Sequence, residues 1–191
     1  MSLTKEYFME ATEGCPVIPA IKNDEWLEAC KESDCGIAYI IYGDICNIAE
    51  IVQKVKAAGK MAIVHVDLIN GLSSKEISVD FLKKYTDMDG IISMKPVMIK
   101  RAKELGIFTI QRFYVMDALS YANVVKHVKN CNPDVVELMP AGLSKIIKYL
   151  LEEIDKPVVA SGLILDKEDV MGALKTGADA VSTTNREVWN C

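Results

Sequence analysis

Two turns near the end of the chain carry residue types suited to binding a phosphate group. One apolar run, Pro157–Ala160, ends at Ser161-Gly162, and a second begins at Ala180 and ends at Thr183-Thr184. Small residues at such turns let an anion approach backbone N–H groups, and the partial positive charge at the start of a following helix favours it. Either turn alone is typical of an ordinary loop. Their succession leaves a phosphate site and a pair of structural turns equally open.

Other polar residues stand at or just after the ends of earlier apolar runs. His65 and Asp67 are two apart on an expected strand, so their side chains should share a face, as should those of Ser93 and Lys95. His65 and Asp67 could ligate a metal, but no third ligand accompanies them. We therefore predict no metal site, and we expect the two side chains to orient each other by hydrogen bonding.

Arg112 and Glu137 have two alternative roles. Arg112 either contacts a ligand or forms a structural ion pair with Glu137 across the open end of the fold. Glu137 could act as a general base beside a bound carbonyl, as in barrel isomerases. No histidine lies on the fourth expected strand to serve as its electrophile, so we predict no catalytic residues. Hydrolase elbows, Walker loops and metalloprotease motifs are also absent from the sequence.

These residues need a scaffold, and the sequence repeats an apolar run followed by an amphipathic stretch. Continuous apolar runs are typical of parallel strands buried on both faces. The expected strands are Val17–Ile21, Gly36–Tyr42, Met61–Val66, Gly90–Met94, Ile107–Arg112, Asp134–Met139, Pro157–Ala160 and Ala180–Thr183. The expected helices are Asp24–Glu32, Asn47–Ala58, Lys75–Tyr85, Pro96–Leu105, Asp117–Lys129, Leu143–Ile154, Lys167–Thr176 and a short Asn185–Asn190. Asn23, Ser74 and Asp166 are expected to cap helix starts.

Eight strands that alternate with helices through short loops favour an α/β fold, a single-domain (β/α)8 TIM barrel. A doubly wound open sheet stays open as an alternative, because periodicity does not give strand order. Residues 1–14 are expected to form an N-terminal extension or a covering helix, and residues 15–191 the barrel domain. The ligand should lie at the carboxyl ends of the strands, where all the polar residues above are found.

The totals describe a globular chain. It has 191 residues, is 50% hydrophobic and carries a net charge of −5. No apolar run is long enough to span a membrane, and the first residues do not form a secretory signal. The six cysteines form no Cys-x-x-Cys pair, which indicates reduced thiols and a cytoplasmic location.

Taken together, several segments resemble one family, the glycerol-3-phosphate-responsive antiterminators (glycerol uptake operon antiterminator regulatory protein). The resemblance extends from about residue 16 to 189, and it includes a His-x-Asp-Leu-x-x-Gly-Leu segment and an Ile-Gln-Arg segment. The segments are Val17–Ile21, His65–Leu72, Gly90–Lys95, Ile110–Phe113 with Asp117, Pro133–Pro140, the two phosphate-type turns, and Trp189.

The resemblance implies a TIM barrel without enzymatic activity that binds glycerol 3-phosphate, uses no cofactor and acts on a leader mRNA. The implied ligand site has Gly162, Leu163, Thr183 and Thr184 around the phosphate, and Arg112, Lys95, His65, Asp67 and Glu137 toward the glycerol end. The chain departs from the family pattern at three places: Ser161 replaces a glycine, Ala141 stands where Gly often follows Pro140, and Met94-Lys95 replaces a Thr-Arg pair. A lysine keeps the charge at residue 95 but loses the bidentate fork of arginine.

One part of the chain is basic within an acidic whole. Residues 95–150 hold nine basic and four acidic side chains, a net charge of +5. Clustered lysines are most often a solvated helical face, and a transcript-binding surface is the alternative. The RNA-binding candidates are Lys100, Arg101, Lys103, Lys126 and Lys129. The sequence leaves open whether the barrel forms a homodimer, and a phosphosugar isomerase or aldolase with Glu137 as base is the alternative function.

Overall fold

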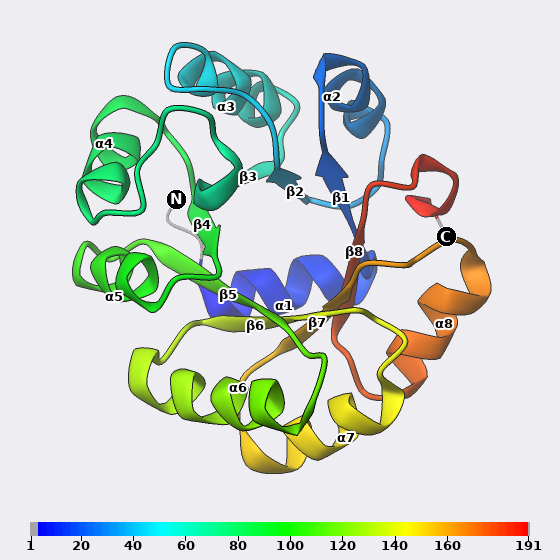
Figure 1. Ribbon diagram of the computed structural model, residues 1–191. Coiled ribbons are helices and arrows are strands. Elements are labelled where there is room, and N and C mark those ends of the chain that lie inside the picture. The colour runs from blue at the N-terminus through cyan, green and yellow to red at the C-terminus, as the bar shows by residue number, and fades with distance from the viewer. Residues whose placement is uncertain (1–3, 191) are drawn as a thin grey trace.

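The computed structural model describes residues 4–190 and shows a closed barrel of eight parallel strands surrounded by helices (Figure 1). Each strand pairs with the next, and β8 closes the ring by pairing with β1. The TIM-barrel prediction is confirmed, and the open-sheet alternative is excluded by this closure. The strands are β1 Val17–Ile21, β2 Ile37–Ile40, β3 Met61–His65, β4 Gly90–Ser93, β5 Phe108–Tyr114, β6 Val135–Met139, β7 Val158–Ser161 and β8 Ala180–Thr183.

Between residues 4 and 190, seven helices pack around the ring, and an eighth, α1, lies across one end of it. They are α1 Lys5–Gly14, α2 Asp24–Lys31, α3 Ile48–Ala57, α4 Ile77–Tyr85, α5 Pro96–Glu104, α6 Ala118–Cys131, α7 Ser144–Glu153 and α8 Lys167–Lys175. Two short 3-10 helices, η1 Val66–Leu68 and η2 Arg186–Val188, follow β3 and β8. The expected domain boundaries, 1–14 and 15–191, include residues 1–3 and 191, which lie outside the described residues.

The core has two layers, as expected of strands that are apolar on both faces. Outward-facing side chains pack beneath the surrounding helices, and inward-facing ones fill the barrel. At the amino ends of the strands α1 seals this interior, because Phe8 is fully buried and its ring stacks on that of Phe108 with centroids 5.6 Å apart. Within the described residues, the interior of the barrel is therefore closed at this end and can open to a ligand at the carboxyl ends of the strands.

The helix boundaries agree with most of the local signals. Asn23 accepts a hydrogen bond from the Trp26 N–H, and Asp166 accepts one from the Asp169 N–H, so both are N-caps. The prediction for Ser74 is wrong, because α4 begins at Ile77, beyond the reach of that side chain as a cap. Pro96 opens α5 as expected.

The unexpected turn η1 corrects the placement of one predicted pair. β3 ends at His65, and Asp67 lies in η1, so the two side chains do not share a strand face. His65 Nδ1 and Asp67 Oδ2 are 4.0 Å apart, too far for a hydrogen bond. The expected mutual orientation is therefore wrong. Lys95 likewise lies beyond β4, at the N-cap position of α5.

Candidate functional site

A cavity of about 280 Å³ opens at the carboxyl ends of β7 and β8. It brings together Gly162, Leu163, Thr183, Thr184 and Arg112, five of the nine ligand residues predicted from the sequence. Its remaining lining residues are Ala20, Ile41, Met139, Ser161, Ile164, Leu165, Ser182 and Asn185. The two turns that the sequence singled out thus form opposite parts of one concave surface, of a size suited to a small ligand.

The turn after β7 contains two successive residues with positive φ. Gly162 and Leu163 have φ angles of 73° and 57°, so both lie in the left-handed region. A Cβ on Gly162 would approach Met139 Cε to 2.7 Å, but that methyl ends a flexible side chain, so it is the positive φ that favours glycine there. Leucine in this region is strained by about 1–2 kcal/mol. Successive N–H groups in such a turn converge on a common point, where an anion can bind.

The turn after β8 is held by two tryptophans. Trp26 Nε1 donates to the Thr184 carbonyl at 2.7 Å, and Trp189 Nε1 donates to the Thr183 carbonyl at 2.9 Å. Thr183 Oγ1 donates to the Ile164 carbonyl at 3.3 Å, which ties the two turns together. These bonds fix the turn within the described structure, and Thr184 is one of the residues that line the cavity.

Several N–H groups of these turns have no protein acceptor. Within residues 4–190, the N–H groups of Leu163, Ile164 and Thr184 donate to no protein atom, whereas the Leu165 N–H bonds to Asp169 Oδ2 at 2.8 Å. Unpaired backbone donors around a concavity are suited to a phosphate or another oxyanion.

The floor of the cavity rests on a buried ion pair. Arg112 Nε donates to Glu137 Oε2 at 2.6 Å, and Ser182 Oγ donates to Glu137 Oε1 at 2.6 Å. Glu137 is fully buried and Arg112 is 8% exposed. Despite this burial, the carboxylate raises the pKa of Arg112, so its charge is kept. The structural pairing considered for these residues is present, and Arg112 also lines the cavity.

His65 is buried inside the barrel below the open end. It is 1% exposed, and desolvation together with the nearby Arg112 charge lowers its pKa to about 4. The imidazole is therefore neutral near pH 7. His65 does not line the cavity.

Asp67 and Lys95 belong to a separate cluster beside the cavity. Asp67 Oδ2 accepts from Ser93 Oγ at 2.9 Å and from the Met94 N–H at 2.8 Å, and Lys95 Nζ lies 3.3 Å from Asp67 Oδ1. Lys95 Nζ also bonds to Ser74 Oγ. These contacts brace the loops after β3 and β4 against each other, and none of them lines the cavity of β7 and β8.

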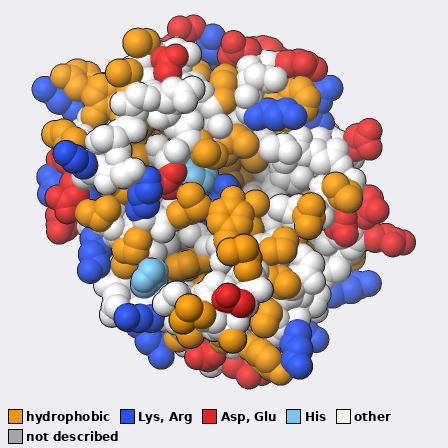
Figure 2. Space-filling model, viewed as in Figure 1, with side chains coloured by type: hydrophobic (Ala, Val, Ile, Leu, Met, Phe, Trp, Pro, Cys, Tyr) orange, Lys and Arg blue, Asp and Glu red, His pale blue; other side chains and the backbone are white. Residues whose placement is uncertain are grey.

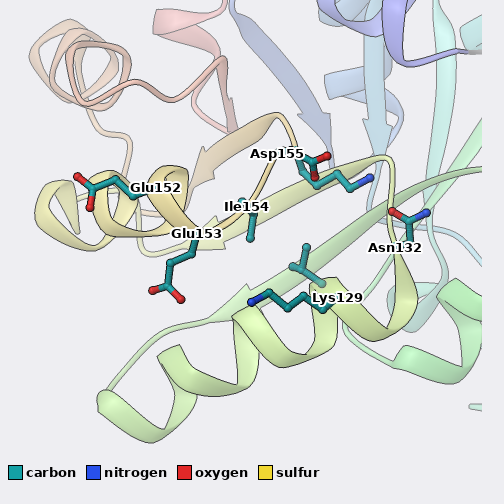
Figure 3. A pocket seen from close by; sticks show the side chains of 8 residues that line it. Lys129, Asn132, Glu152, Glu153, Ile154 and Asp155 are labelled. Atoms are coloured by element: carbon teal, nitrogen blue, oxygen red, sulfur yellow. The ribbon is translucent and has the colours of Figure 1, made fainter.

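A second hollow, of about 420 Å³, lies at the opposite end of the barrel between α6 and α7 (Figure 3). Lys129 on α6 and Glu153 on α7 stand on facing sides of it. Glu152 and Asp155 add two more carboxylates, and Lys156 a second cation. An acidic groove of this kind repels a phosphate, so the hollow is a poor candidate for an anion despite its larger volume.

The five basic residues proposed for RNA fall into two groups. Arg101 is paired with Asp80 at 2.5 Å and Glu104 at 2.9 Å, and Lys103 is paired with Asp134 at 2.6 Å. In the part of the chain that the structure describes, no ion pair involves Lys100, Lys126 or Lys129, which are exposed on the adjacent helices α5 and α6. Of the five, Lys100 and Lys126 present uncompensated charge to a partner, whereas Lys129 faces Glu153 across the acidic hollow.

The open face also carries exposed apolar side chains. Figure 2 shows hydrophobic side chains gathered near the centre of the face that Figure 1 views. Those exposed after β5 and β7 include Met116, Leu119, Leu163 and Leu165. No helix among residues 4–190 is long and apolar enough to cross a membrane.

Sequence reasoning left several lining or supporting residues out of the site. The sequence does show that Ser182 is a polar residue near the end of the last strand. It is two residues from the inward-facing Ala180, so it lies on the same face. The sequence does not predict a role for Tyr39 in the site, because this residue lies within an apolar run that is typical of the core. Trp26 sits on a helix, and its contact with Thr184 spans 158 residues of sequence.

The fold and the site define a class of protein: a small TIM barrel with a cavity at the carboxyl ends of strands seven and eight. The family model described as "Glycerol-3-phosphate responsive antiterminator" matches residues 17–189. The chain belongs to this family, which supports a regulatory role.

Individual relatives agree. The chain is 43% identical over 174 residues to "Uncharacterized protein YgcP" of Escherichia coli (strain K12), covering 91% of each. It is similar to the crystal structure of the glycerol uptake operon antiterminator regulatory protein from Listeria monocytogenes, with TM-score 0.87, 31% identity and coverage of 91% and 94% of the two chains. A glycerol uptake operon antiterminator-related protein from Thermotoga maritima matches with TM-score 0.82, 27% identity and coverage of 92% and 98%. Aldolase barrels at 11% and 13% identity share the fold alone.

Proposed function

We propose that this chain is a non-enzymatic regulator that binds glycerol 3-phosphate in the cavity after β7 and β8, and that ligand occupancy governs its action on a leader mRNA. The observation that carries the proposal is the set of unpaired N–H groups at Leu163, Ile164 and Thr184 around one small cavity. The phosphate would accept from these donors and from the Thr184 hydroxyl. Arg112 would add the one cationic group of the cavity wall.

The glycerol end would point inward, toward Arg112 and the residues beneath it. Arg112 and Ser182 line the cavity while they hold Glu137 in place. Lys95 and Asp67 neutralise each other outside the cavity, so we assign them to the shape of the rim rather than to ligand contact. The ligand needs no cofactor for this mode of binding, and a regulator of this kind would act in the cytoplasm.

Calorimetry with glycerol 3-phosphate, inorganic phosphate and glycerol tests the ligand. We expect glycerol 3-phosphate to bind, phosphate to bind more weakly and glycerol not to bind detectably, because the donors of the two turns serve the phosphate. Thr184→Val should weaken binding about tenfold, since it removes a hydroxyl that contacts only the ligand.

Thr176→Val is the matched control, because Thr176 Oγ1 donates to the Ala173 carbonyl at the end of α8, away from the cavity. Equal binding of glycerol and its phosphate, or an equal loss of affinity in both variants, would remove the cavity as the phosphate site.

The transcript would bind across α5 and α6. Lys100 and Lys126 are exposed there without intramolecular ion pairs among the described residues, and phosphate contacts of this kind weaken steeply with salt. Lys129 borders the acidic hollow and is the weakest of the three candidates. Lys126→Glu should weaken leader RNA binding in a gel-shift assay and reduce its salt dependence. Lys54→Glu is the control, because Lys54 pairs with Glu50 on α3, on the other side of the barrel. Equal effects of the two substitutions would argue against this surface.

The alternative is a phosphosugar isomerase or aldolase with Glu137 as general base. Glu137 is fully buried, and each of its oxygens already accepts a hydrogen bond. A base must reach the proton that it abstracts, so this arrangement favours the regulator. Turnover of triose or pentose phosphates that is abolished by Glu137→Gln would reverse this conclusion.

A further inference from the structure

Two polar groups buried beneath the cavity have no partner within the described part of the chain. They are the Tyr39 hydroxyl and His65 Nδ1. Tyr39 is fully buried and His65 is 1% exposed, so bulk water does not solvate either group. Leaving one such donor or acceptor unpaired costs about 1–3 kcal/mol. Both groups lie close enough to Arg112 and Glu137 to feel their charges, so a molecule bound above that pair could supply both partners.

The position of Tyr39 connects it with the cavity. Its Cα is in register with that of Ala20 on β1, and Ile41 follows two residues later on the same inward face. Ala20 and Ile41 are both walls of the cavity. Tyr39 itself does not line the cavity, so a ligand would reach its hydroxyl past these two residues.

The charges around Tyr39 define what its hydroxyl can do. Burial and the Glu137 carboxylate hold the pKa of Tyr39 well above its ordinary value, so the group stays a neutral O–H. Glu137 does not take its proton, because Arg112 and Ser182 already donate to the two carboxylate oxygens. The hydroxyl is therefore a donor and acceptor without a partner, beside an ion pair that is internally neutralised.

These features point to a neutral, hydrogen-bonding occupant. A second anionic group would face Glu137, and a cation would face Arg112, both at low dielectric. An apolar group would leave Tyr39 and His65 unpaired. A hydroxyl group fits both constraints, because it can accept from the phenol and exchange a hydrogen bond with the neutral imidazole.

We propose that Tyr39, assisted by His65, is a specificity-determining residue that recognises the hydroxylated end of a phosphate ester whose phosphate occupies the β7 and β8 turns. This inference rests on the proposed ligand site and goes beyond it by assigning the selection of hydroxyl groups to Tyr39. The site then rejects deoxy analogues, because such a ligand leaves the buried polar groups unpaired when it binds.

Calorimetry with two ligands and three proteins tests this assignment. The ligands are glycerol 3-phosphate and propyl phosphate, which keeps the phosphate and the three carbons but lacks both hydroxyls. The proteins are the unsubstituted chain, Tyr39→Phe and Tyr42→Phe. Tyr42 is the matched control on the same segment, because its hydroxyl donates to Asp24 Oδ1 at 2.9 Å on the outer side of the barrel.

We expect Tyr39→Phe to raise the Kd for glycerol 3-phosphate about tenfold and to change that for propyl phosphate less than twofold. Tyr42→Phe should leave both unchanged. The melting temperature of ligand-free Tyr39→Phe should be equal or higher, since the substitution removes an unpaired hydroxyl. A tyrosine with a purely structural role would instead lose stability when its hydroxyl is removed.

The outcomes separate the two proposals. If neither ester binds the unsubstituted chain, the phosphate site itself is wrong and this inference falls with it. If both esters bind and Tyr39→Phe affects them equally, or affects neither, the phosphate site stands and the role of Tyr39 is refuted. Loss of ligand-free stability without a change in ligand preference would assign the hydroxyl to a buried water.

Discussion

The buried pair of Arg112 and Glu137 allows a quantitative test of the barrel floor. Arg112→Met removes the guanidinium and keeps a side chain of similar reach. Glu137 then keeps one hydrogen bond, from Ser182, in a fully buried position. Breaking a buried ion pair at one partner destabilises by about 3–5 kcal/mol, because a charge stays behind without compensation. Because Ser182 still donates to Glu137, we expect a loss of about 3 kcal/mol in the free energy of unfolding, at the lower end of this range.

For a chain of this length, about 1 kcal/mol corresponds to 2–4 °C in melting temperature, so Arg112→Met should lower it by about 6–12 °C. Urea unfolding followed by circular dichroism gives the free energy directly. The second variant, Arg112→Met with Glu137→Leu, should recover most of the loss, because well-packed apolar groups can replace a buried pair. Ser182 loses its hydrogen-bond acceptor in the double variant, so the double variant should remain about 1 kcal/mol less stable than the unsubstituted chain.

The double-mutant cycle decides the result. A coupling energy near 2 kcal/mol or more would show that the cost of the single change comes from the stranded carboxylate. A loss below about 1 kcal/mol for Arg112→Met, or strictly additive effects, would refute the view that the floor depends on this pair.

Two further predictions concern residues on either side of that pair. The pKa of His65 is lowered to about 4 in the folded chain, against about 6.5 when unfolded. Its contribution to the free energy of unfolding is therefore complete above pH 6.5 and is lost as the pH falls toward 4. Urea unfolding should therefore give a free energy of unfolding about 2 kcal/mol lower at pH 5 than at pH 7 because of this residue. His65→Gln should abolish that difference. If the difference is the same in the variant, His65 is not a buried neutral imidazole. Gly162→Ala should destabilise the fold by about 1 kcal/mol because residue 162 has a positive φ. Gly172→Ala, in the middle of α8 where a Cβ meets no other atom, should stabilise the fold by a similar amount. Changes of the same sign for both variants in thermal unfolding would refute the backbone argument.

Much of the scaffold could be predicted because its signals are local. The strands Val17–Ile21 and Ala180–Thr183 were predicted with their observed boundaries, since apolar β-branched runs between turn residues have few alternative structures. Ser74 shows the limit of such signals. A serine before a helical pattern is a plausible cap, but the first turn of α4 starts three residues later.

The site was predictable where it depends on strand ends and turns, and not where it depends on contacts across the barrel. Gly162 and Thr184 are brought together because β7 and β8 are neighbouring parallel strands, which follows from the fold. The bend at η1, which turns Asp67 toward Ser93, depends on tertiary contacts that no local pattern encodes. Tyr39 became visible only when the barrel interior showed that its hydroxyl has no partner.

The charges of the barrel imply that ester binding in the cavity and RNA binding on α5 and α6 would depend differently on salt. The cavity wall contains one cation, Arg112, and Glu137 neutralises it, so a phosphate there would be held mainly by backbone dipoles and hydroxyls. The exposed lysines of α5 and α6 are point charges in solvent. Dipoles in a preformed turn are weakly screened by salt, whereas binding by exposed lysines releases counterions. Ester affinity should therefore change only slightly between 50 and 200 mM salt, while RNA affinity falls about tenfold or more for a few phosphate contacts. An ester affinity that falls as steeply as the RNA affinity would mean that net charge, and not the geometry of the two turns, holds the phosphate.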